Sequence, residues 1–118
     1  MPKFFYVFMY ELPGVAAMDK RMGMGWDESM HIVIEAETKE LAKEWGDTLA
    51  KEYVDIIYQN PDDAAKALKL TPSYDGEIEE GELHPWIKQH FQSIPVVRYQ
   101  ERPDLVKWVQ ERYGPGPY

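Results

Sequence analysis

Residues 3–10, "KFFYVFMY", and residues 30–37, "MHIVIEAE", decide the expected fold of this chain. Both segments are rich in the aromatic and β-branched residues that favour strands. Successive side chains of a strand point to opposite faces, so the first strand would carry aromatic residues on one face. These residues are Phe4, Tyr6, Phe8 and Tyr10.

The two faces of the second strand differ more in polarity than those of the first. Ile32 and Ile34 fall on one face, and His31, Val33 and Glu35 fall on the other. Because helices bury aliphatic stripes, we expect the helices of the protein to cover the face of Ile32 and Ile34, together with Phe5, Val7 and Met9 of the first strand. The aromatic face would then lie beside His31, Val33 and Glu35.

A long helix is predicted over residues 39–58, after Thr38 as the N-terminal cap. Its apolar side chains recur at three- and four-residue steps, as an amphipathic helix requires. They are Leu41, Trp45, Leu49, Tyr53, Ile56 and Ile57. Gly46 costs about 1 kcal/mol relative to alanine inside a helix, and the close approach of another backbone would account for it.

The rest of the chain predicts further short elements. Asn60 and Pro61 begin a short helix through "AAKALKL", and residues 71–82 are a turn-rich acidic loop. A helix at 85–94, a strand at 95–100 and a helix from Pro103 to Gly114 follow. This order predicts one α+β domain over residues 1–118: a small, mainly antiparallel sheet of about three strands with helices on one face, in a ferredoxin-like or related two-layer sandwich.

The aromatic face needs a cover, because burial of each such side chain is worth about 1.5–3 kcal/mol. A helix or the long loop of the same chain could cover it. A second copy of the protein could pack against it, or it could line a pocket for a small apolar or aromatic ligand.

The segment between the two strands, residues 11–30, is far longer than a hairpin turn. Methionine side chains are adaptable, and loops of this length often bind or cover a site. We therefore expect Met22, Met24 and Trp26 to contribute to an adaptable cover of the aromatic face, within one chain or across a dimer.

Composition excludes several classes of function. The chain has a net charge of −8 and no basic run, so the release of counterions from phosphates would support little nucleic-acid affinity. It has no cysteine, which excludes disulfides and thiolate zinc sites and fits a cytoplasmic protein. Apolar stretches fall well short of the roughly 18 residues that a membrane-spanning helix needs.

The scan for chemical motifs finds no phosphate loop, nucleophile elbow or metal-ligand spacing, so no catalytic residue, metal or cofactor is assigned. Three functions stay open. The sequence favours a small acidic binding or interaction protein that forms a homodimer through the aromatic face. A ligand-binding or enzymatic domain would instead use a pocket with Tyr6, His31 and Glu35. An acidic inhibitor or nucleic-acid mimic would occupy a basic site on another protein.

Overall fold

The computed structural model describes residues 2–11, 27–58, 61–69 and 94–115. Within these ranges the elements follow in the order β1 (Lys3–Glu11), β2 (Asp27–Glu35), α2 (Lys39–Tyr58), α3 (Pro61–Ala67), β3 (Leu68–Lys69), β4 (Val96–Arg98) and α5 (Leu105–Tyr113). The expected loop 71–82 lies outside the described residues, as does nearly all of the expected helix 85–94.

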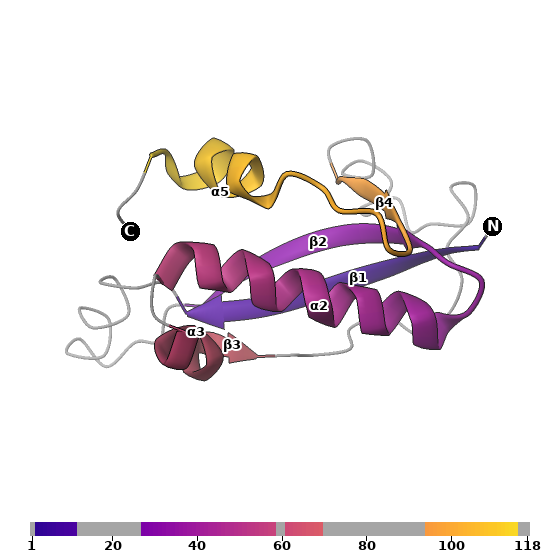
Figure 1. Cartoon of the computed structure of the whole chain (residues 1–118), viewed down its shortest axis with the longest axis horizontal. Coiled ribbons are helices and arrows are strands. Elements are labelled where there is room, and N and C mark those ends of the chain that lie inside the picture. The colour runs from indigo at the N-terminus through magenta and orange to yellow at the C-terminus, as the bar shows by residue number, and fades with distance from the viewer. Residues whose placement is uncertain (1, 12–26, 59–60, 70–93, 116–118) are drawn as a thin grey trace.

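The strands form one sheet in the order β3-β1-β2-β4. β1 pairs antiparallel with β2 and with β3, whereas β4 pairs parallel with β2. Figure 1 shows α2 running across β1 and β2, with α5 beside it. The prediction of an α+β fold with helices on one sheet face is confirmed. A ferredoxin-like arrangement is not confirmed, since the sheet is small and one of its pairings is parallel.

The helix ends follow local signals in the sequence. The hydroxyl of Thr38 accepts a hydrogen bond from the Leu41 N–H at 3.2 Å, which caps the start of α2. The side chain of Asp104 accepts from the Lys107 N–H at 3.1 Å at the start of α5. Gly114, at a φ of 78°, follows the last residue of α5. The predicted boundaries of both helices are therefore confirmed.

The strands differ more from the sequence-based expectation. β2 begins at Asp27, within the segment expected to be a loop, because its backbone pairs with the end of β1. The short helix predicted to run to Leu70 ends at Ala67, where the next two residues pair with β1 as β3. β4 is shorter than predicted because a turn begins at Arg98, whose carbonyl accepts from the Glu101 N–H at 2.9 Å.

The main hydrophobic core lies between the sheet and the helices. Leu49, Val54 and Ile57 of α2 and Val109 of α5 are fully buried in it. Leu41 and Ile56, which belong to the predicted stripe of α2, are partly buried at its border. Among the described residues, no helix is both long enough and apolar enough to cross a membrane.

Candidate binding site

The aromatic side chains of β1 face α2 and not away from it. Phe4 lies directly opposite Ile34, and Tyr6 opposite Ile32, so these residues share one face of the sheet. The prediction that Phe4, Tyr6, Phe8 and Tyr10 share a face with His31, Val33 and Glu35 is wrong. The sequence pattern was compatible with two registers that differ by one residue, and such a slip moves every side chain of a strand to the other face.

Helices of the same chain cover the aromatic face, which is the first of the three covers considered. Phe8 and Tyr10 are both 0% exposed and form one core cluster with α2, α3 and α5. These aromatic side chains are therefore not available for contact with a second copy of the chain. Formation of a homodimer stays a prediction, but it would need a different surface.

His31 and Glu35 point to the opposite face of the sheet, the face of Phe5, Val7 and Val33. The rings of His31 and Phe5 lie 5.6 Å apart between centroids. Glu35 forms ion pairs with Arg98 at 3.5 Å and Lys3 at 3.9 Å. The sheet thus separates these two side chains from Tyr6, and the three do not form one pocket. Met22, Met24 and Trp26 lie outside the described residues.

Tyr6 instead belongs to a polar contact with α2. Its hydroxyl donates to Asp47 Oδ1 at 2.6 Å, and Lys43 donates to the other carboxylate oxygen at 3.0 Å. Burial, and then the hydrogen bond to Asp47, raise the pKa of Tyr6 well above its ordinary value. The Tyr6 ring also packs against Gly46, so it is an aromatic ring and not another backbone that accounts for this glycine.

A second cluster of tyrosines joins β1, α2 and α5. The hydroxyls of Tyr10 and Tyr113 share a hydrogen bond, and the rings of Tyr10 and Tyr53 lie 5.6 Å apart between centroids. Burial above all, followed by the hydrogen bond to Tyr113, raises the pKa of Tyr10 far above its ordinary value. The Tyr53 hydroxyl is buried and has no hydrogen-bond partner among the described residues. The phenols of Tyr6 and Tyr10 remain protonated near neutral pH, so neither is suited to act as a base there.

Removal of a single tyrosine hydroxyl should change the free energy of unfolding differently in these two clusters. Tyr6→Phe leaves Asp47 without one of its donors, and we expect a loss of about 1 kcal/mol in the free energy of unfolding. Tyr53→Phe removes a buried hydroxyl that has no partner, so the free energy of unfolding should stay the same or rise. Urea unfolding of both variants measures the difference, and an equal loss in the two would contradict these assignments.

The Arg112 side chain occupies one backbone group of β2 at the sheet edge beside β4. Among the described residues, β4 pairs with Val33, Ile34 and Glu35 of β2. Farther along β2, the Ser29 carbonyl accepts from Arg112 of α5 at 2.7 Å. This contact occupies a backbone acceptor that an added strand would need at this position.

A hollow of about 330 Å³ lies where α2, α3 and β3 meet. Its apolar lining comes from α3 and β3, and consists of Pro61, Ala64, Ala65 and Leu68. Lys51 and Asp55, one turn apart on α2, line it as well and are both exposed. Figure 1 shows α3 and β3 together beside the C-terminal half of α2. Apolar walls with a few polar groups are typical of small-ligand sites, and this volume is at the lower end of their range.

Sequence reasoning did not identify this hollow, because each of its parts has an ordinary local explanation. Lys51 and Asp55 belong to a series of charged residues along the solvent side of α2. The small side chains of α3 are good helix formers. Only the turn between the two helices, marked by Pro61, signalled that two helices would meet here.

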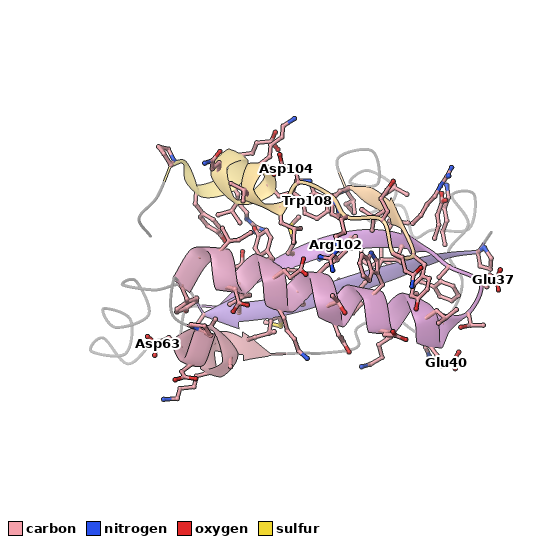
Figure 2. The ribbon with its side chains drawn as sticks, viewed as in Figure 1. Glu37, Glu40, Asp63, Arg102, Asp104 and Trp108 are labelled. Carbon is pink, nitrogen blue, oxygen red and sulfur yellow. The ribbon has the colours of Figure 1, made fainter. Side chains whose placement is uncertain are left out.

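Figure 2 shows other polar side chains on the helix side of the molecule, among them Arg102 between α2 and the segment that leads into α5. Arg102 lies over the Trp45 ring and bonds Glu52 at 2.6 Å. The guanidinium of Arg102 is therefore engaged in contacts that join two parts of the fold. Among the residues described, no three histidine or acidic side chains gather in a way that could hold a metal ion.

Comparisons with protein-family models, curated proteins and solved structures gave no match.

Proposed function

We propose that the protein is a binding protein and that it binds small ligands with aliphatic groups in the hollow between α2, α3 and β3. The observation that supports this most is the combination of an apolar lining with Lys51 and Asp55 in one concave site. An apolar ligand would gain from the removal of its surface from water, and the two charged groups would orient it.

The alternative sites have less support. The aromatic side chains of β1 are buried in the core, and Tyr6, His31 and Glu35 lie on two faces of the sheet. The hollow needs no rearrangement of the core, because it is lined by the outer sides of two helices and a short strand. A homodimer, an acidic inhibitor and a cytoplasmic location stay predictions from the sequence.

The test fills the hollow and leaves the core intact. Ala65 is exposed and lines the hollow, so Ala65→Trp should block it without a large change in stability. Gln110→Trp places the same side chain at an exposed position of α5 and is the matched control. The readout is the set of backbone amide shifts of residues 62–68 in ¹H–¹⁵N spectra.

Four forms of alanyl-leucine serve as probes: the free dipeptide, its N-acetyl form, its C-terminal amide, and the form blocked at both ends. At least one should shift the amides of residues 62–68 in the wild type and in Gln110→Trp, but not in Ala65→Trp. If none of the four shifts these amides, the proposed function is wrong. Equal shifts in Ala65→Trp would place the binding elsewhere and would also contradict it.

A further inference from the structure

Two charged side chains at the hollow lack the partners that similar residues have elsewhere on α2. Lys43 and Asp47 stand one turn apart and form an ion pair at 3.0 Å. Lys51 and Asp55 have the same residue types, spacing and order, yet neither takes part in an ion pair within the described part of the chain. Farther along the surface, Glu52 is paired with Arg102 at 2.6 Å. Lys51 and Asp55 thus give the hollow one positive and one negative side chain, neither of which is held by an ion pair among the described residues.

We propose that the ligand is a short zwitterionic peptide with aliphatic side chains, about the length of a dipeptide. This rests on the proposed function of the hollow. The carboxylate of the ligand would lie at Lys51 and its ammonium group at Asp55. Its aliphatic side chains would pack on the lining from α3 and β3.

The spacing of the charges favours this length. Residues four apart in a helix are separated by about 6 Å along the axis. The two ends of an extended dipeptide are about 7 Å apart, whereas both charges of a free amino acid are attached to one carbon atom. A dipeptide spans this separation with its own backbone, whereas a free amino acid would do so only through the lengths of its hydrogen bonds to Lys51 and Asp55.

The lining favours aliphatic side chains. Ala64, Ala65 and Pro61 are small or compact and leave room above them, and Leu68 gives a larger apolar contact on the side of β3. No ring stacking is available from these residues. A ligand with two opposite charges also suits a site whose two charged side chains sum to zero, in spite of the net charge of −8 of the whole chain.

The test measures the affinity of each of the four alanyl-leucine probes for the wild type and for two variants, Lys51→Gln and Asp55→Asn. The affinities come from titrations that follow the amide shifts of residues 62–68. The free dipeptide should bind most tightly in the wild type, with a dissociation constant of about 1 mM for a ligand of this size. Lys51→Gln should weaken the two probes that have a free carboxylate by about two- to fivefold, and Asp55→Asn should weaken the two that have a free ammonium group by a similar factor. Neither variant should affect the probe blocked at both ends.

The outcomes separate the two proposals. If all four probes bind at the hollow with equal affinity, the proposed function stands and the zwitterionic ligand is wrong. If free leucine binds as tightly as the free dipeptide, the assigned length is wrong. If no probe binds, both proposals fail together. Asp62→Asn and Lys66→Gln, which change exposed charges on α3 outside the hollow, control for an effect of net charge alone.

Discussion

Phe8→Ala should lower the free energy of unfolding by about 3–5 kcal/mol, the cost of removing a large aromatic side chain from a packed core. Phe8 is 0% exposed, and its ring lies 5.4 Å from that of Tyr53 on α2 and 5.8 Å from that of Tyr10, between centroids. A domain of this size has about 5–15 kcal/mol of stability in all, so the variant should lose a large part of it. Urea unfolding followed by circular dichroism gives the value.

The same residue distinguishes the buried face from a dimer interface. If Phe8 formed an interface between two copies, Phe8→Ala would give a folded monomer of nearly unchanged stability, and light scattering would show the fall in mass. We expect Phe8→Ala to lower the free energy of unfolding and not to give a folded monomer of unchanged stability. Phe8→Leu is the conservative control and should cost far less, because it keeps most of the buried volume. A stable, monomeric Phe8→Ala from a dimeric wild type would contradict the assignment of this face to the core.

Gly46→Ala should destabilise the protein by about 2 kcal/mol, although alanine is the better helix former. A side-chain carbon at position 46 would lie 2.6 Å from two carbons of the Tyr6 ring, well inside van der Waals contact. The ring is held by the hydrogen bond of its hydroxyl to Asp47, so it cannot move aside without loss of that bond. The gain in helix propensity, about 1 kcal/mol, offsets only part of the overpacking.

A double-mutant cycle with Tyr6→Leu tests the cause. The smaller side chain removes the ring atoms that collide, so Gly46→Ala should be neutral or stabilising in the Tyr6→Leu background. Asp55→Ala, at an exposed position of the same helix, should change the free energy of unfolding by less than about 1 kcal/mol. If Gly46→Ala were stabilising in the wild-type background, the assigned close contact between Gly46 of α2 and the Tyr6 ring of β1 would be wrong.

Local signals were sufficient for α2 and α5, whereas the end of α3 depended on the pairing of Leu68 and Lys69 with β1. Thr38, Asp104 and Gly114 each act through neighbours within four residues, and those contacts depend little on the rest of the fold. The apolar stripe of α2 was also visible, since a helical period fits few other arrangements of the same residues. The α+β class followed from these helices and from two strongly β-prone segments.

The orientation of the sheet required long-range contacts. β1 is apolar on both faces, so its sequence alone did not say which face packs on α2. The prediction that Ile32 and Ile34 of β2 face the helices agrees with the structure, but the assignment of Phe5, Val7 and Met9 of β1 to the same face was wrong. The actual choice depends on the register of β1 with β2 and on Gly46, which gives the ring of Tyr6 room against α2. These contacts join residues from 16 positions apart, for Glu11 and Asp27, to 41 positions apart, for Tyr6 and Asp47.

The candidate site also depends on tertiary structure. Lys51 and Asp55 look like ordinary solvent-facing charges until α3 and β3 are packed beside them. Periodicity and caps thus determined α2, α5 and the class of fold, because these follow from interactions between near neighbours. The buried face of the sheet and the hollow depend on contacts between segments that are distant in sequence. Strand register and helix packing are set by the fit between side chains of those segments, and a local sequence pattern does not contain that information.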